Sequence, residues 1–312
     1  MGRLAGLGLL LVLATAVISG LSTFLNSYAV QGTNSDAFVT VRNVAVAVMI
    51  APVALYFARR SPTRLDRTDL AWLAVIGLVG GAIPFLLFFH GLALATAAGG
   101  AATASFVYRT LFLMATVLAV VVLGERFRAR VVAGAALLLA GNVLLLSWVS
   151  PLWTPGTSFV ALATVLWAVE YTLSKRLLRR VPSTTVGFGR MGFGALFLLA
   201  YLALTSQYGS VAALSAGQWG WVGISAALLA AFVLTWYAGL RWTDLTVATS
   251  ILVLGFPVTW VLDVAVRTSS VTAAAALGAA VVAVGAAVVA GRDRWAALAG
   301  ALRSRAAPRP AG

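Results

Sequence analysis

Cysteine is absent from this chain, and its only histidine is His90. Without cysteine there are no disulfides, thiolate metal sites or cysteine nucleophiles, and one histidine is too few for a metal site. The chain also lacks a His-Glu-x-x-His motif, a Gly-x-Ser-x-Gly nucleophile elbow and a Walker-type phosphate-binding loop. We therefore expect no metal, no other cofactor, no catalytic constellation and no ATPase activity of its own.

Charged residues are scarce as well: they make up 10% of the 312 residues, against about 25% in a soluble domain. Hydrophobic residues make up 62%, and the mean hydropathy is +1.00. Such a chain lacks the residues for a polar surface, which lipid does not require. The net charge of +14 falls in short clusters between apolar runs, so it indicates membrane topology and not nucleic-acid binding.

Ten runs are long and apolar enough to cross a bilayer as helices, which takes about 20 residues each. The first run is too long for the apolar core of a signal peptide, so we interpret it as a transmembrane helix. The linkers are short, so neighbouring helices are antiparallel. The sequence thus predicts an all-α polytopic membrane protein with spans at residues 5–25, 37–57, 70–94, 99–123, 131–148, 157–174, 184–204, 219–240, 245–266 and 271–290.

The basic residues outside the spans lie almost entirely on one side of the membrane. Eighteen lie in one set of alternate loops and termini, and only Arg267 lies in the opposite set. Cytoplasmic loops are enriched in Lys and Arg, so both termini are predicted to be cytoplasmic, with the protein in the cell membrane. Residues 291–312, rich in Arg, Ala and Pro, are interpreted as a loose basic cytoplasmic tail that touches anionic lipid.

The two halves of the chain resemble each other. The run LATAVISGLSTFL from Leu13 matches LATVLWAVEYTL from Leu162 at an offset of 149, and Arg42 matches Arg190 at 148. Each half has five spans, and because five is odd the second copy enters the membrane upside down. This predicts an inverted five-plus-five repeat, residues 5–148 and 157–290, which in transporters places the substrate near the midplane. Further matches join His90-Gly91-Leu92 to Ala238-Gly239-Leu240, and Gly134 and Gly141 to Gly278 and Gly285.

Two segments resemble a known family. The run LGERFRARVVAGAALLLAGNVLLL from Leu123 looks like the end of an EamA repeat of the drug/metabolite transporter superfamily, and WAVEYTLSKRL from Trp167 looks like the opening of the second repeat. The resemblance covers about residues 5–291 and implies ten helices, a central cavity and small-solute transport, often export. It has two departures. Arg267-Thr268-Ser269-Ser270 replaces Leu-Gly-Glu in the second repeat, and Tyr108-Arg109-Thr110 stands near where a proline is common in the first.

Arg109 is the clearest buried charge, and a charge at the bilayer centre by default marks a functional site. It lies deep in its span, with Ser105 and Thr116 on the same helix face and Tyr108 beside it. One interpretation is an anchor for an anion or carboxylate in the cavity. The other is a structural ion pair or a clamp on a backbone carbonyl, and the sequence leaves both open.

Glu170 lies on one helix face with Trp167, Tyr171 and Ser174, at helical spacing. Arg190 lies at a matching depth in the following span. The matching depths favour a structural Glu170–Arg190 pair over a Glu170 that binds protons or substrate.

Other residues inside the spans have two interpretations each. Arg42, Asp263 and His90 are candidates for ion pairing or proton coupling. The alternative for Arg42 is snorkelling to the interface, for Asp263 contact with interface water, and for His90 a packing role. Pro84 and Pro257 are candidate hinges or static kinks. The predicted lining of the cavity is Arg109, Tyr108, Ser105, Trp167, Glu170, Tyr171, Trp236, Tyr237 and Trp260.

Small residues recur two turns apart on the last helix of each repeat: Gly134 with Gly141, and Gly278 with Gly285. They permit close helix contact, so these two helices are predicted to pack on each other or to support a homodimer. Glu125, in the turn before the first of them, is assigned to ion pairs with the arginines that follow it.

These features predict a secondary transporter that works by alternating access. We expect it to export or exchange a small metabolite, such as an amino acid or another carboxylate-bearing solute. Its partners are then the solute, the bilayer and a second copy of the chain, with no nucleic acid. A non-catalytic scaffold or receptor is the alternative, and a membrane-embedded enzyme is least favoured. Solute flux through the purified protein in liposomes distinguishes these classes.

Overall fold

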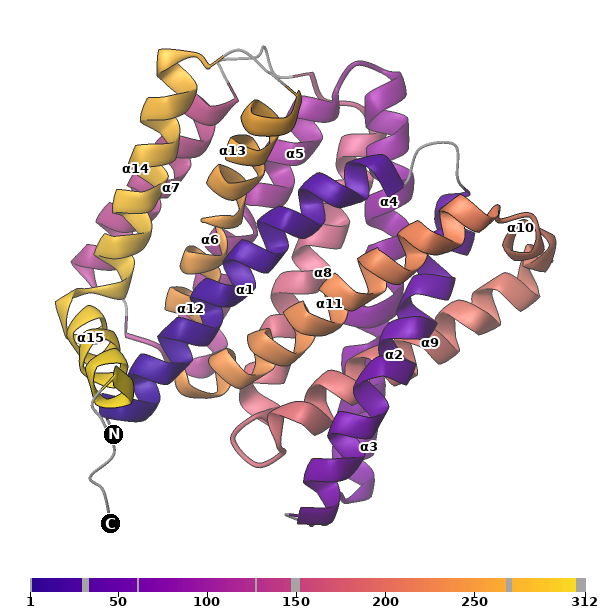
Figure 1. The fold of residues 1–312 in the computed structure, drawn as a ribbon, viewed down its shortest axis with the longest axis horizontal. Helices are drawn as coiled ribbons and strands as arrows, with labels where there is room; N and C mark the ends of the chain where they lie inside the picture. The colour runs from indigo at the N-terminus through magenta and orange to yellow at the C-terminus, as the bar shows by residue number, and fades with distance from the viewer. Residues whose placement is uncertain are drawn as a thin grey trace.

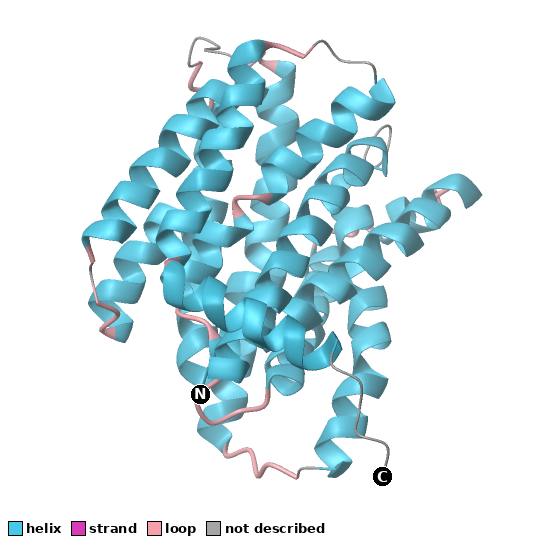
Figure 2. Ribbon diagram, turned by 60° about the vertical axis from the view of Figure 1, so that its left-hand side comes forward, coloured by secondary structure: helices cyan, strands magenta, loops and turns pink. Residues whose placement is uncertain are grey.

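The computed structural model describes residues 2–29, 34–60, 62–126, 128–146, 152–267 and 271–306, and these residues are almost all helical (Figure 1). No strand occurs within these ranges (Figure 2). Nine helical stretches in them are long and apolar enough to cross a membrane, and the tenth predicted span is a shorter apolar helix of 17 residues, Ala129–Leu145. The prediction of an all-α polytopic membrane protein is confirmed.

Short connections join the helices. The first half contains α1 (Gly2–Ala29), α2 (Ser35–Arg60), α3 (Arg67–Ile76), the π-helical turn η1 (Gly77–Ala82), α4 (Ile83–Ala97), α5 (Ala101–Arg109), α6 (Leu111–Leu123) and α7 (Ala129–Leu145). The second half contains α8 (Pro155–Leu177), α9 (Ser183–Leu204), α10 (Tyr208–Ala212), α11 (Ala216–Trp242), α12 (Leu245–Leu252), α13 (Gly255–Arg267), α14 (Ala273–Ala290) and α15 (Arg292–Ala306). The start of α1 and the whole of α15 lie at the same end of the bundle (Figure 1).

Local caps begin several of these helices. The hydroxyl of Thr154 accepts a hydrogen bond from the backbone N–H of Thr157, and Pro155 occupies the first turn of α8, where no N–H is required. Ser215 and Gln218 form the same reciprocal capping box at the start of α11. These side chains satisfy backbone donors that have no partner within their own helix.

The two halves pack on each other as an inverted repeat. The first helix of each half packs on the third span of the other, because α1 lies against α11 and α8 lies against α4. The second helices, α2 and α9, contact each other, and so do the last, α7 and α14. The fourth span of each half packs on the first helix of the other half, with α6 on α8 and α13 on α1. Each contact therefore has a counterpart in the other half, as a twofold axis between the halves would produce.

Glycines lie at corresponding positions of the two halves where the first helix of one half crosses the third span of the other. A Cβ on Gly91 of α4 would lie 2.7 Å from the carbonyl oxygen of Gly156 in α8. A Cβ on Gly239 of α11 would lie 3.1 Å from the carbonyl oxygen of Gly8 in α1. Gly8 precedes Gly156 by 148 residues, and Gly91 precedes Gly239 by the same number. The same close helix crossing therefore occurs twice, once between α4 and α8 and once between α11 and α1.

The helices α7 and α14 lie side by side at the edge of the bundle (Figure 1). A Cβ on Gly141 would lie 2.8 Å from the carbonyl oxygen of Gly278, and one on Gly285 would lie 3.0 Å from that of Gly134. The glycine faces therefore cover each other within one chain. A homodimer through these helices stays a prediction, and it would have to use their opposite faces.

The fourth span of each half is interrupted near its middle. In the first half α5 ends at Arg109 and α6 begins at Leu111, and in the second half α12 ends at Leu252 and α13 begins at Gly255. The second break has a local cause: Pro257 cannot bond the carbonyl four residues before it, and its ring crowds that carbonyl. Broken helices free backbone groups, which a membrane protein tolerates only beside a cavity or inside the protein.

The described part of the C-terminal tail is not loose. Residues Arg292–Ala306 form α15, which packs on α1, and the Trp295 indole donates to the carbonyl of Ala287 at 3.2 Å. The prediction of a loose tail is wrong here because Trp295, Leu298 and Leu302 share one helix face, and Leu298 is buried. Residues 307–312 lie outside the described part of the chain, as do residues 268–270, which replace the Leu-Gly-Glu turn.

Replacing Gly141 by alanine is expected to destabilise the protein, because the added Cβ would lie 2.7 Å from the Val282 side chain and 2.8 Å from the Gly278 carbonyl. Gly223→Ala is the matched control, since nothing lies within 4 Å of a Cβ at that position of α11. Alanine otherwise favours a helix over glycine by about 0.5–1 kcal/mol. We therefore expect G141A to lower the melting temperature in detergent and G223A to leave it unchanged or raise it. Equal melting temperatures would contradict the packing of α7 on α14.

Candidate functional site

A cavity of about 300 Å³ lies between the two halves. Three arginines line it, Arg42 on α2, Arg109 at the end of α5 and Arg190 on α9, and none of the described carboxylates does. The walls between the arginines are largely aromatic and come from both halves. The aromatic lining residues are Phe85, Phe88, Phe89, Tyr108, Trp167, Tyr171, Phe232 and Phe256.

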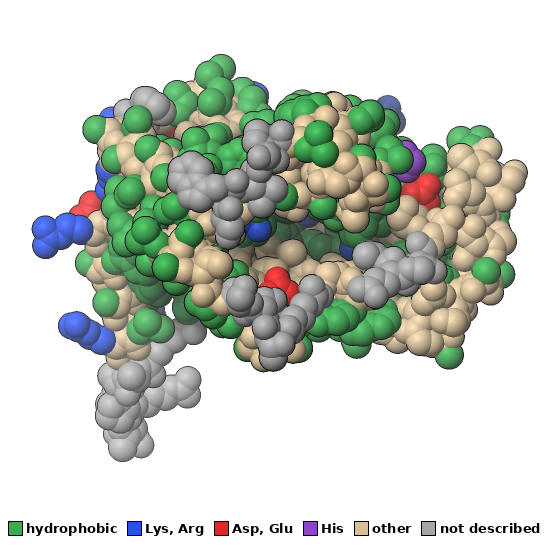
Figure 3. Space-filling model, turned by 90° about the horizontal axis from the view of Figure 1, so that it is seen from above, with side chains coloured by type: hydrophobic (Ala, Val, Ile, Leu, Met, Phe, Trp, Pro, Cys, Tyr) green, Lys and Arg blue, Asp and Glu red, His purple; other side chains and the backbone are tan. Residues whose placement is uncertain are grey.

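The cavity lies in the half of the bundle away from the start of α1. The α1 residues that line it run from Ser19 to Ser27, in the second half of a helix that begins at Gly2. Figure 3 looks onto the end of the bundle opposite the N-terminus and shows a hollow with basic side chains inside it. The hollow and the cavity thus lie toward the same end of the molecule.

The irregular turn η1 positions one of the arginines. Pro84 has no N–H, so it cannot bond the carbonyl of Gly80, four residues earlier. That carbonyl accepts instead from the indole N–H of Trp167 at 3.2 Å and from Nη2 of Arg190 at 3.1 Å. Gly80 has no room for a side chain, since a Cβ would lie 2.8 Å from Cδ of Glu170. Such π-helical turns are frequent at functional sites.

The next carbonyl of the same turn positions a second arginine indirectly. Asn43 donates from Nδ2 to the carbonyl of Gly81 at 2.9 Å, and its Oδ1 accepts from Nε and Nη2 of Arg42 at 3.2 and 3.1 Å. The Arg42 guanidinium carbon lies 4.9 and 5.3 Å from the ring centroids of Phe85 and Phe89. Arg42 therefore turns into the bundle, where its side chain is 2% exposed, and does not snorkel outward.

Glu170 and Arg190 form a buried ion pair beside the cavity. Nε of Arg190 lies 3.6 Å from Oε2 of Glu170, and the two side chains are 2% and 0% exposed. Oε1 of Glu170 accepts from the hydroxyls of Tyr237 at 2.5 Å and Ser174 at 2.6 Å. Short bonds of this kind are characteristic of an ionised acceptor. Arg190 faces the cavity, whereas Glu170 lies behind it and does not line it.

Arg109 is less compensated than Arg190. Its guanidinium carbon lies 4.3 Å from the centroid of the Phe256 ring, which belongs to α13 of the other half. No ion pair joins Arg109 to a described residue, and its buried Nε has no hydrogen-bond partner among them. The carbonyl end of α5 gives some support to a cation. The two interrupted spans thus meet at the cavity through Arg109 and Phe256.

The structure separates the predicted lining residues into two groups. Trp236 and Tyr237 are fully buried behind the wall, with the Trp236 ring 4.6 Å from that of Tyr171, because α11 turns Phe232 toward the cavity instead. Glu170 lies with them, and Trp260 also lies outside the lining. The predicted residues that do line the cavity are Ser105, Tyr108, Arg109, Trp167 and Tyr171.

Two further candidates lie away from the cavity. His90 is exposed, and its ring stands edge-on to Phe159 at 5.5 Å. Asp263 is partly buried in α13 and does not line the cavity. Neither the proton-coupling role of His90 nor that of Asp263 gains support from these positions.

A polar strip on α1 was not predicted. Its members, spaced 0, 3, 4, 7 and 8, lie on one helix face of an otherwise apolar span. That spacing is visible in the sequence and would have identified α1 as a cavity wall. The strip consists of Ser19, Ser22, Thr23, Asn26 and Ser27.

The Leu-Gly-Glu turn joins the halves at the opposite end of the bundle. Gly124 ends α6 in the left-handed conformation, with φ of 68°. The carboxylate of Glu125 then accepts from the backbone N–H of Leu245 at 2.6 Å and of Thr246 at 3.1 Å, at the start of α12. Carboxylates are favourable at helix N-termini. The assignment of Glu125 to local ion pairs is therefore wrong, because its partner is the backbone of the other repeat.

These helices define a multi-pass membrane protein with a central cavity between its two halves. The model of the EamA-like transporter family matches residues 6–147 and 154–291. The chain therefore belongs to the EamA-like transporter family, within the drug/metabolite transporter superfamily, whose members are transporters and not enzymes. A protein of known crystal structure has a similar fold, with a TM-score of 0.72 and 22% identity, over 90% of this chain and 96% of that one. No curated protein matches the chain.

Glu170→Gln keeps an acceptor for Tyr237 and Ser174 but removes the charge beside Arg190. Stranding one partner of a buried ion pair costs about 3–5 kcal/mol, so E170Q and R190Q should each lower the melting temperature in detergent. The double variant E170Q/R190Q strands no charge and should lose less stability than the two single variants together. Additive losses across the four proteins would show that the two residues act independently and would contradict the pair.

Proposed function

We propose that the protein is a secondary transporter that exports or exchanges a small carboxylate-bearing metabolite, amino acids included, by alternating access. The observation that carries this proposal is the charge of the cavity. Arg42, Arg109 and Arg190 line it without a lining carboxylate, and Glu170 offsets only Arg190. A carboxylate on the solute supplies a missing counter-charge, and the aromatic walls accommodate its apolar part.

The cost of Arg109 supports a role in binding. Insertion scales place an arginine at the bilayer centre at about 2.5–3.5 kcal/mol unfavourable. The ring of Phe256 offsets about 0.5–2 kcal/mol of this. The cost of burying Arg109 therefore exceeds the stabilisation that its contacts inside the protein supply. Because Arg109 lies at the cavity, an anionic solute could supply the missing counter-charge.

Polar contacts at the other end of the bundle support alternating access. Glu125 of the first half accepts hydrogen bonds from the backbone N–H groups of Leu245 and Thr246, at the start of α12 in the second half, at 2.6 and 3.1 Å. The cavity lies on the far side of these contacts. Exposure of the cavity to this end requires Glu125 to separate from α12, which makes this contact the expected inner gate.

Replacing Arg109 by leucine is expected to abolish measurable transport of carboxylate-bearing solutes while leaving the fold intact. A lost charge-assisted contact weakens solute binding by about 10–100-fold. The melting temperature should hold or rise, because no ion pair is broken and an uncompensated charge is removed. The two measurements are melting in detergent and solute counterflow in liposomes, across amino acids and organic acids.

Arg292→Leu is the control for this experiment, since it removes an exposed arginine of α15 far from the cavity. Normal counterflow by R109L would exclude the anchoring role of Arg109. A large fall in its melting temperature would instead assign Arg109 to the structure.

Both termini are expected to be cytoplasmic, because 18 of the 19 basic residues outside the spans lie on that side. The cavity then faces outward in this structure. Reporter fusions at the C-terminus and in the connection at residues 205–217, which contains α10, measure the orientation. A tail reporter active only outside the cell would contradict this orientation.

A further inference from the structure

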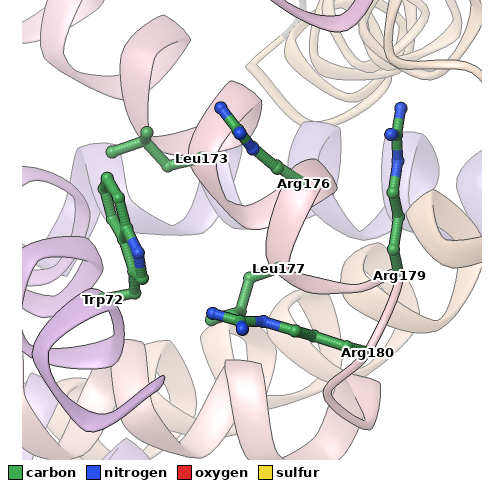
Figure 4. A pocket seen from close by; sticks show the side chains of 6 residues that line it. All are labelled: Trp72, Leu173, Arg176, Leu177, Arg179 and Arg180. Carbon is green, nitrogen blue, oxygen red and sulfur yellow. The ribbon is translucent and has the colours of Figure 1, made fainter. Parts of the chain in front are cut away.

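A second hollow, of about 390 Å³, lies between α3 and the end of α8, outside the central cavity. Figure 4 shows it from close by: Trp72 of α3 stands on one side, and the side chains from the end of α8 stand on the other. None of its residues lines the central cavity. They are Trp72, Leu173, Arg176, Leu177, Arg179 and Arg180, which we call the α3–α8 groove.

The groove carries positive charge that the described residues do not offset. Arg180 is committed to a partner, since its Nη2 lies 2.8 Å from Oδ1 of Asp69 in α3. Arg176 and Arg179 are exposed and form no ion pair with a described residue. Their position in and just after the last turn of α8 complements the helix dipole, which offsets only a fraction of a charge. The groove therefore presents two guanidinium groups to an external anion.

The rest of the groove is apolar, and one of its walls, Trp72, comes from the exposed side of α3. Leu177 forms a buried floor at 4% exposure, and the Trp72 indole is 40% exposed. Val75, about one turn further along α3 on the side of Trp72, is also exposed, at 39%, as expected for a residue in contact with lipid. Tryptophan favours the headgroup level of a membrane. The arginines thus lie at headgroup depth, with apolar surface running from them into the hydrocarbon.

We propose that the α3–α8 groove binds an anionic phospholipid, with the phosphate on Arg176 and Arg179 and the upper acyl chain along Trp72 and Leu173. The asymmetry of cytoplasmic basic residues explains why arginines lie on this side. It does not explain why two of them border a hollow with an indole wall and a leucine floor. A free phosphate ion would contact the arginines alone, whereas a lipid contacts both the arginines and the apolar walls of the groove. This site is independent of the solute cavity.

The test compares phosphatidylglycerol with phosphatidylcholine, and both with inorganic phosphate, by native mass spectrometry and thermal melting in detergent. Wild-type protein should retain phosphatidylglycerol preferentially and melt at a higher temperature with it. The variant R176Q/R179Q should bind it about thirtyfold more weakly, at about fivefold for each arginine near the surface. Arg180 is left in place so that its ion pair with Asp69 persists.

R292Q/R303Q is the matched control, because it removes two exposed arginines of α15 that do not border the groove. Preferential binding that survives in R176Q/R179Q, or falls equally in both double variants, would overturn the proposal. Stabilisation of the wild type by inorganic phosphate to the same extent as by phosphatidylglycerol would also overturn it, in favour of a soluble anion. If R176Q/R179Q does not accumulate, Arg179→Gln alone should weaken phosphatidylglycerol binding relative to Arg303→Gln, and equal binding would reject the site.

Discussion

The π-helical turn η1 is the element on which the site depends. Because Pro84 cannot bond the carbonyl of Gly80, that carbonyl is free to hold Trp167 and Arg190. The next carbonyl, of Gly81, holds Asn43 and through it Arg42. One irregular turn in the third span of the first repeat therefore sets the direction of two cavity arginines and one aromatic wall. Backbone carbonyls of this kind carry partial negative charge without adding a titratable group, so they position both arginines, but among the described residues only Arg190 has a full counter-charge, from Glu170.

The balance of charge in the bundle then decides what the cavity can bind. Glu170 neutralises Arg190 and is itself held by Tyr237 and Ser174 behind the wall. Arg42 rests on phenylalanine rings and Arg109 on Phe256, contacts that stabilise a cation without removing its charge. A cationic solute would add to this excess, whereas an anionic one would reduce it. The aromatic walls, the arginines and the hydroxyl strip of α1 together suit a small amphipathic anion.

Hydropathy was sufficient to predict the spans, and the repeat offset was sufficient to predict their inverted pairing, because both depend on properties that recur along the chain. The depths of Glu170 and Arg190 predicted their contact for the same reason. The rotation of α11 was not predictable, since Phe232, Trp236 and Tyr237 are all large and apolar enough to face a cavity or a neighbouring helix. The role of Glu125 was missed because its partner is a helix N-terminus 120 residues later, which no local spacing reveals. The amphipathic face of α15 was visible in the sequence, but the many arginines of this segment led to the prediction of a loose tail.

The central claim is that an excess of positive charge in the cavity selects an anionic group on an apolar body. Benzoate, benzamide and benzylamine test it directly, since they share a ring and differ in charge at the same position. Tryptophan fluorescence reports their binding to the purified protein, because Trp167 lines the cavity. The account predicts that benzoate binds more tightly than benzamide, that benzylamine does not bind, and that R109L removes the preference. Equal binding of benzoate and benzamide, or preferential binding of benzylamine, would contradict it.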